Sequence, residues 1–239
     1  MKKRIPIVIG LLLGFSLLPA RVASAGPCLP STLQGYINLG NTGCTLGGAD
    51  FADFQLELGQ NFATPINPAQ IQVTPTSGGS SLGFLFTVNQ TANTGQLFES
   101  FFSYTASAVG FNMARLSMTG ATATGDSAVT TVEDICVGGS FLGGVPIGCP
   151  GTSATMIAIV TANDNLPNDL AAFATNGFLN VFDDLTIDGG LFGTAGVTSF
   201  TNLFDVTTPT ATVPEPATGL LLAAGLGAML RRARRSSRP

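Results

Sequence analysis

Residues 82–88, LGFLFTV, and residues 98–108, FESFFSYTASA, decide the fold of this protein. In the first stretch every second position is apolar, at Leu82, Phe84, Phe86 and Val88. In the second stretch the same spacing is kept by Phe98, Ser100, Phe102, Tyr104, Ala106 and Ala108. Successive side chains of a strand point to opposite faces, so this spacing predicts two strands that each bury one face.

The sequence on either side continues the pattern. Residues 113–119, MARLSMT, place Ala114, Leu116 and Met118 on the face opposite Arg115 and Ser117. Further short runs, separated by turn residues, cover residues 55–58, 70–74, 128–137, 155–161, 178–187 and 197–206. About nine or ten short strands predict an all-β fold, a single antiparallel β-sandwich or jelly-roll-like domain over residues 26–206. The one helix expected within it begins at Pro167 and ends near Gly177.

The N-terminus has the three parts of a secretory signal peptide. Lys2, Lys3 and Arg4 precede an apolar run over residues 5–18, and Ala23-Ser24-Ala25 supplies small residues for cleavage. We therefore expect a signal peptide over residues 1–25 and a mature chain that starts at Gly26. An uncleaved anchor is the alternative, and the shortness of the apolar run disfavours it.

Four cysteines stand in the expected mature chain. They are Cys28, Cys44, Cys136 and Cys149. An even number in an exported protein indicates disulfides, and three pairings are open. We favour Cys28 with Cys44 and Cys136 with Cys149, because each couple is close in sequence. A zinc site is disfavoured, since the chain has no histidine and no CxxC spacing.

The charge of the expected mature domain is strongly negative. Between Gly26 and Val213 there are thirteen acidic residues and one basic residue, Arg115. Such a surface repels phosphate backbones, so nucleic-acid binding is excluded as a function class.

The C-terminus carries a motif, an apolar segment and a basic cluster, in that order. A Thr/Pro-rich linker over residues 207–213 leads into Val213-Pro214-Glu215-Pro216, and an apolar segment follows over residues 217–230. At 1.5 Å per residue this segment would cover roughly 21 Å as a helix, less than the roughly 30 Å hydrocarbon core of a bilayer. The basic residues after it are Arg231, Arg232, Arg234 and Arg235. Positive residues beside a membrane segment stay cytoplasmic, so the folded domain would lie outside.

This tail, residues 214–239, resembles the PEP-CTERM sorting domain, also catalogued as the ice-binding protein C-terminal domain, of exported proteins from biofilm-forming Gram-negative bacteria. The resemblance implies that an exosortase, a membrane protease-transpeptidase, recognises the Pro-Glu-Pro motif and removes the tail. It also implies a membrane-anchored precursor that contacts the inner membrane transiently through residues 217–230 and then reaches the cell surface or extracellular matrix. A permanently anchored protein with a rigid proline linker is the alternative.

Little in the expected domain predicts catalysis. Nucleophilic triads lack a histidine, and no lysine survives removal of the signal peptide. Glu133-Asp134 and Asp183-Asp184 are adjacent pairs within predicted strands, so the two members of each pair point to opposite faces. We interpret all four as solvated surface acids.

We expect no cofactor, and a calcium site is the alternative, although no EF-hand-like loop is present. The candidate ligands are Asp164, Asp169, Asp183, Asp184 and Asp188. Carbohydrate binding lacks its usual aromatic platform, because the chain has no tryptophan and only two tyrosines.

The sequence therefore predicts an exported, non-enzymatic structural or adhesive protein of the cell surface or matrix. Its expected partners are an exosortase-type enzyme and extracellular polysaccharide. The alternatives are a secreted carbohydrate- or calcium-binding module and an acid-dependent secreted hydrolase.

Overall fold

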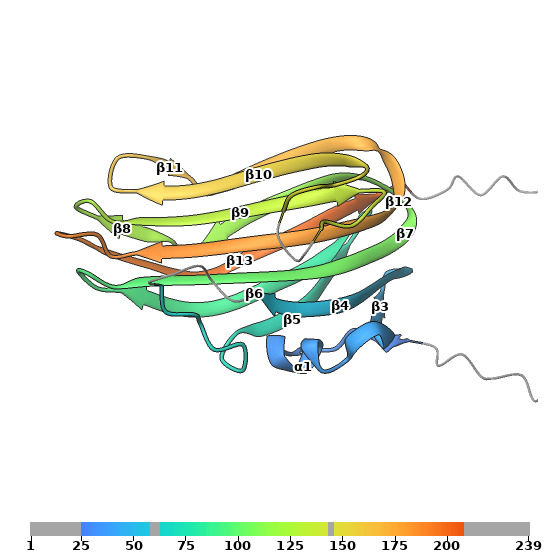
Figure 1. The fold of residues 1–239 in the computed structure, drawn as a ribbon, viewed down its shortest axis with the longest axis horizontal. Helices are drawn as coiled ribbons and strands as arrows, with labels where there is room; N and C mark the ends of the chain where they lie inside the picture. Colours follow the sequence, from blue (N-terminus) through green and yellow to red (C-terminus); the bar gives the residue numbers. More distant parts are fainter. Residues whose placement is uncertain (1–24, 58–62, 143–145, 208–239) are drawn as a thin grey trace, which may run out of the picture.

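The computed structural model of the chain describes residues 25–57, 63–142 and 146–207. These residues form one hydrogen-bonded sheet of thirteen strands that folds over into two layers (Figure 1). The elements in chain order are β1 (Gly26–Pro27), β2 (Ser31–Thr32), α1 (Leu33–Ile37), a 3-10 turn (Gly40–Thr42), β3 (Cys44–Leu46), β4 (Ala49–Glu57), β5 (Gln72–Gly78), β6 (Ser81–Ala92), β7 (Leu97–Thr119), β8 (Thr122–Thr124), β9 (Ala128–Val137), β10 (Thr152–Thr161), β11 (Asn165–Leu166), β12 (Asn168–Asp188) and β13 (Thr194–Val206).

Two long antiparallel strands, β7 and β12, run through both layers. They pair from Leu97 opposite Asp188 to Ser117 opposite Asn168, with register shifts between Ala172 and Phe178 where the strands bend. Before the bend β7 pairs with β4 on its other side, and after it with β13. The strands therefore divide into two groups that face each other.

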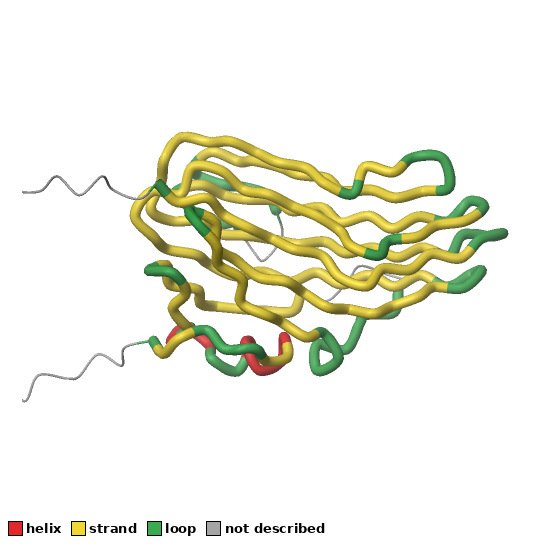
Figure 2. Tube along the Cα trace, turned by 180° about the vertical axis from the view of Figure 1, so that it is seen from behind, coloured by secondary structure: helices red, strands yellow, loops and turns green. Residues whose placement is uncertain are grey.

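The first layer contains β4, the N-terminal half of β7, the C-terminal half of β12, β9 and β10. The second layer contains the other halves of β7 and β12 with β13, β6 and β5. Figure 2 shows the strands of both layers running lengthwise, with the loops at the two ends. Short helix α1 lies against one side and is capped by the Thr32 hydroxyl, which accepts from the Gly35 amide.

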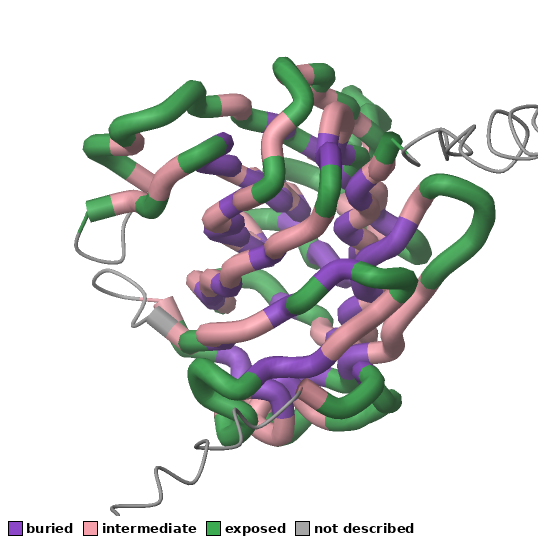
Figure 3. Tube along the Cα trace, turned by 90° about the vertical axis from the view of Figure 1, so that its right-hand side faces the viewer, coloured by how far each residue is buried: buried purple, intermediate pink, exposed green. Residues whose placement is uncertain are grey.

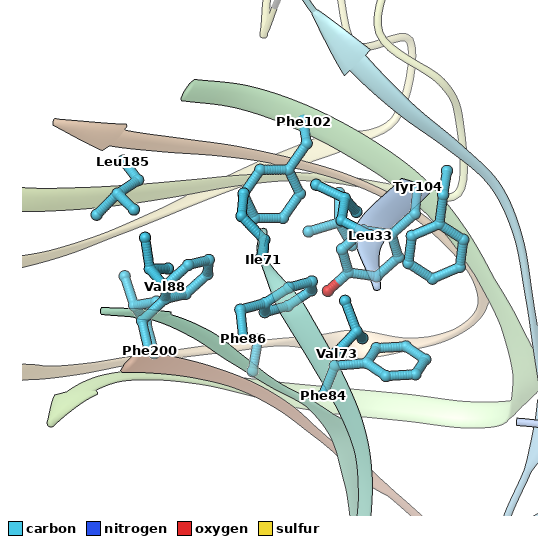
Figure 4. Packing of buried hydrophobic residues seen from close by; sticks show 14 of the residues in the cluster. Leu33, Ile71, Val73, Phe84, Phe86, Val88, Phe102, Tyr104, Leu185 and Phe200 are labelled. Atoms are coloured by element: carbon cyan, nitrogen blue, oxygen red, sulfur yellow. The ribbon is translucent and has the colours of Figure 1, made fainter. Parts of the chain in front are cut away.

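The core lies between the layers and is mainly aromatic. Phe86 of the second layer contacts Phe102 of the first with ring centroids 4.9 Å apart, and it stacks on Phe200 at the same distance. Figure 4 shows Phe102 and Tyr104 on one side of this packing and Phe84, Phe86 and Phe200 on the other. Seen along the sandwich, the buried segments lie toward its middle and the exposed ones lie around its outside (Figure 3). Each fully buried phenylalanine stabilises the fold by roughly 1.5–3 kcal/mol.

The predicted all-β class is confirmed, and the two packed layers agree with a β-sandwich. The runs expected at residues 98–108 and 113–119 are one continuous strand, β7. The helix expected between Pro167 and Gly177 is wrong, because this segment is the first half of β12. Its residues Asn168 to Ala172 pair with Ser117 to Met113 of β7, and this pairing outweighs the local helical propensity.

The predicted signal peptide and the C-terminal sorting helix lie outside the described residues. Within the described ranges, no helix is long and apolar enough to cross a membrane.

Candidate functional site

Both disulfides join the favoured partners. Cys28 is bonded to Cys44 at the start of β3, and Cys136 of β9 is bonded to Cys149 in the loop before β10. The bonded cysteines are 16 residues apart in the first bridge and 13 in the second.

A group of polar side chains lies inside the core, where the sequence predicts apolar packing. We call Tyr104, Thr131, Glu133, Asp183 and Asn202 the core polar cluster. All five residues are 0% exposed. They come from both layers: Tyr104 from β7, Thr131 and Glu133 from β9, Asp183 from β12 and Asn202 from β13.

Strand register brings the cluster together. Glu133 and Asp183 are direct cross-strand partners of β9 and β12, so both side chains point to the same, inner face. Thr131 stands two residues before Glu133 and shares that face. From the opposite layer, Asn202 Nδ2 donates to both carboxylate oxygens of Asp183 at 2.8 Å and to the Tyr104 hydroxyl at 3.3 Å.

Burial dominates the electrostatics of the core polar cluster. It raises the pKa of Glu133 well above the usual value for glutamate, and the nearby Asp183 carboxylate raises it further. Burial likewise raises the pKa of Asp183, against the lowering effect of the Asn202 hydrogen bond. Arg115, the one basic residue between Gly26 and Val213, lies outside, where it donates to Asp205 at 2.9 Å.

The two acids that adjoin the cluster in sequence face the opposite way. Asp134 accepts from the Thr155 hydroxyl and Asp184 from the Thr186 hydroxyl, both on the outer face of the first layer. The predicted opposite orientation within each pair is therefore right. The interpretation of all four as surface acids is wrong for Glu133 and Asp183, because their alternate strand positions turn them into the core.

The five candidate calcium ligands are not brought together. Asp183 is in the core and Asp184 is on the outer face, whereas the other three lie at strand ends or turns. Asp164 sits in the turn before β11, Asp169 accepts from the amides of Ile157 and Leu170, and Asp188 accepts from the amide of Gly190. Across the described ranges, no three Asp, Glu, Cys or His residues are grouped as metal ligands.

A groove on the outer side of β7 brings polar side chains together beside leucines. Its volume is about 420 Å³. We call it the Arg115 groove, and it is lined by Arg115, Leu116, Ser117, Asn168, Asp169, Leu170 and Leu203. The Arg115 side chain is 47% exposed there. The groove offers hydrogen-bond donors and acceptors beside apolar leucines, without an aromatic ring.

Asn202, Thr131 and Tyr104 are site residues that the sequence pattern did not predict. Asn202 could have been predicted as a buried polar residue, because it shares a strand face with Phe200 and Phe204. Glu133 has a similar place, since Ile135 two residues later is buried. Their meeting across the layers depends on packing that the pattern does not encode.

No family model matches the chain, and no curated protein matches it. Among solved structures, the carbohydrate-binding module TmCBM61 in complex with β-1,4-galactotriose matches with a TM-score of 0.30 and 10% identity, over 64% of this chain and 88% of that one. The enzymatically active domain of tailspike protein 4 from bacteriophage CBA120 matches with a TM-score of 0.25 and 10% identity, over 64% of this chain and 19% of that one. Likenesses this low carry no argument about function.

Proposed function

We propose that this chain is an exported, non-enzymatic structural or adhesive protein of the cell surface or extracellular matrix. The observation that carries the proposal is the pair of disulfides, Cys28–Cys44 and Cys136–Cys149, closed within one small β domain. Disulfides persist in oxidising compartments, and they support domains of secreted proteins in particular. Export followed by sorting through Val213-Pro214-Glu215-Pro216 accounts for the two ends of the chain.

The position of the core acids supports a role without catalysis. Glu133 and Asp183 are opposite one another, as a paired-carboxylate hydrolase requires, yet both are 0% exposed. A general acid or base must come within hydrogen-bond reach of the substrate. The layers cover both side chains, so this pair does not support the hydrolase alternative.

The test is the intact mass and the cell fraction of the native protein. We expect a mature species that starts at Gly26, ends near Pro214 and is found outside the cell. The triple variant Pro214→Ala/Glu215→Ala/Pro216→Ala should keep its tail and stay in the membrane fraction. Pro209→Ala, which removes a proline of the linker and leaves the motif intact, is the matched control. An intact tail in the membrane for all three proteins would overturn the sorting proposal.

A second function, binding of a neutral extracellular polysaccharide, is favoured by the Arg115 groove. The guanidinium of Arg115 and the side chains of Asn168 and Asp169 present donors and acceptors beside Leu203 in an open depression. A few placed polar groups beside apolar surface are typical of small-molecule sites. The strongly acidic domain disfavours an anionic chain, so we propose a neutral one.

Binding to neutral glucans and galactans, measured by affinity electrophoresis, tests this second function. We expect Arg115→Met and Asn168→Ala each to weaken retardation at least about tenfold, the effect of losing roughly 1.4 kcal/mol. Thr74→Ala is the control, because Thr74 lies on the outer face of β5 in the same layer but outside the groove. This variant should leave the retardation unchanged. Equal retardation of all three variants and the wild type would place any binding elsewhere.

A further inference from the structure

The core polar cluster holds two acids whose charge is not balanced by Arg115, the one basic residue in the described part of the chain. Glu133 and Asp183 are opposite one another on β9 and β12, and both are 0% exposed. Arg115 is on the outside of the second layer in its pair with Asp205. Ionised carboxylates in a dry core are strongly disfavoured unless a counter-charge is present or a proton is taken up. The cluster therefore needs either a cation or protons.

The unpartnered oxygens of the cluster are a second, independent observation. Among the residues that the structure describes, both carboxylate oxygens of Glu133, Oγ1 of Thr131 and Oδ1 of Asn202 find no hydrogen-bond partner, although all three residues are fully buried. Buried polar atoms of native proteins nearly always have a partner. Asn202 is fixed in the cluster by its hydrogen bonds to Asp183, and Thr131 lies beside Glu133 on the same inner strand face. The orphaned atoms are all oxygens, which are acceptors toward a cation.

We propose that the core polar cluster binds one Ca²⁺ ion between the two layers. Glu133 and Asp183 supply the charged ligands, and Asn202 Oδ1 and Thr131 Oγ1 supply neutral ones. Ca²⁺ takes six to eight oxygens in a flexible geometry and accepts carboxylates in mono- or bidentate form, so two carboxylates and two neutral oxygens supply most of its ligands. Its charge also equals that of the two acids.

Other metals fit this set of ligands less well. Mg²⁺ demands near-ideal octahedral geometry and gives up its water reluctantly, which is unfavourable at a site enclosed by two layers. Zinc and copper prefer imidazole and thiolate, and this chain has no histidine while its four cysteines are in disulfides.

The position of the site gives the ion a structural role. Its ligands come from β9 and β12 in the first layer and from β13 in the second, so the ion would join the layers. Because both layers enclose the cluster, we expect the ion to enter as the domain folds. A ligand that binds only the folded state stabilises it in proportion to the logarithm of its concentration.

The experiment is refolding of the full chain, with its disulfides formed, in Ca²⁺, in Mg²⁺ or in EGTA at neutral pH. Metal content is measured after removal of free ions, and the thermal midpoint is measured with each ion or EGTA present. We expect one Ca²⁺ per chain, a midpoint that rises with Ca²⁺ concentration, and no such rise with Mg²⁺. These wild-type measurements decide the proposal even where a core variant does not fold.

Charge-neutral variants of nearly equal size locate the site. Glu133→Gln and Asp183→Asn should lose the bound ion and the response to Ca²⁺, with apparent affinity at least tenfold weaker. Asp134→Asn and Asp184→Asn change the adjacent residues, which face outward, and should keep the full response.

Two results would overturn the proposal. The first is a wild-type protein that holds no Ca²⁺ and has the same thermal midpoint in Ca²⁺ and in EGTA. Glu133→Gln would in that case be more stable than wild type at neutral pH. Protons would then neutralise the acids. The second is a response that survives in the core variants and disappears in Asp134→Asn or Asp184→Asn, which would place the ion on the outer face.

Discussion

At the scale of single residues, Asp126 holds the loop between β12 and β13. Its carboxylate accepts hydrogen bonds from the amides of Leu191 and Phe192 at 2.9 and 2.8 Å. These hydrogen bonds to the charged form lower the pKa of Asp126. The loop is therefore stabilised by an ionised carboxylate.

The lowered pKa gives Asp126 a pH-dependent effect on stability. A pKa depressed in the folded state contributes stability that is present above the unfolded value, about 3.9, and is lost as pH falls through the folded value. We expect Asp126→Asn to lower the thermal midpoint at pH 7 and to differ less from wild type at pH 3. Asp164→Asn, at an exposed turn, is the control. A wild-type advantage of equal size at both pH values would contradict this account.

The same scale shows why the sequence alone could not identify the core polar cluster. The alternation of residues places Glu133 and Asn202 on inward faces, and that much can be predicted. Which inward residues meet depends on the register of β9 with β12 and on how β13 packs across from them. Contacts between the two layers leave no periodic pattern in the sequence. Glu133 and Asp183 therefore resemble ordinary surface acids when only the sequence is considered.

At the scale of elements, the alternating period predicted most of the strands. The expected strand at residues 128–137 has the same bounds as β9, and residues 82–88 lie within β6. The failure at residues 167–177 has a local cause, since Pro167 and the following Asp, Leu and Ala residues favour the start of a helix. Pairing with β7 supplies backbone hydrogen bonds that local propensity does not reveal.

Gly110 lies at the bend of β7, where the pairing with β12 shifts register. Its φ of 88° lies in the left-handed region, and a Cβ at this position would meet the Thr207 hydroxyl. We expect Gly110→Ala to destabilise the domain by about 1–2 kcal/mol, the cost of this conformation for a residue with a side chain. The measurement is urea unfolding followed by fluorescence of the tyrosines.

Gly177→Ala is the matched control for Gly110→Ala. Gly177 lies in β12, near the bend, and is not among the glycines with positive φ. An alanine there is strained only by a 3.3 Å approach to the Ala108 carbonyl. If Gly110→Ala lowers the free energy of unfolding no more than Gly177→Ala does, the left-handed backbone conformation at Gly110 is not needed for the bend.

At the scale of the whole molecule, the two disulfides constrain the unfolded chain. The bonded cysteines are 16 and 13 residues apart. Loops of this length give about 3 kcal/mol of stabilisation per bridge. We expect Cys28→Ala/Cys44→Ala and Cys136→Ala/Cys149→Ala each to lose about that much in urea unfolding, and reductant to lower the thermal midpoint of the wild type. A midpoint that reductant leaves unchanged would show that the bridges do not contribute.

The ends of the described chain give the sandwich a direction. Gly26 begins β1, and Thr207 donates its amide to the Gly110 carbonyl at the bend, so the chain enters and leaves at one end of the sandwich (Figure 1). The loop with Leu191 and Phe192, which are 70% and 84% exposed, lies at the other end. If the chain is attached to a cell surface or matrix beyond Thr207, the bend end of the sandwich faces the attachment site. The exposed loop with Leu191 and Phe192 then faces away from it and is the first part of the domain to contact another surface.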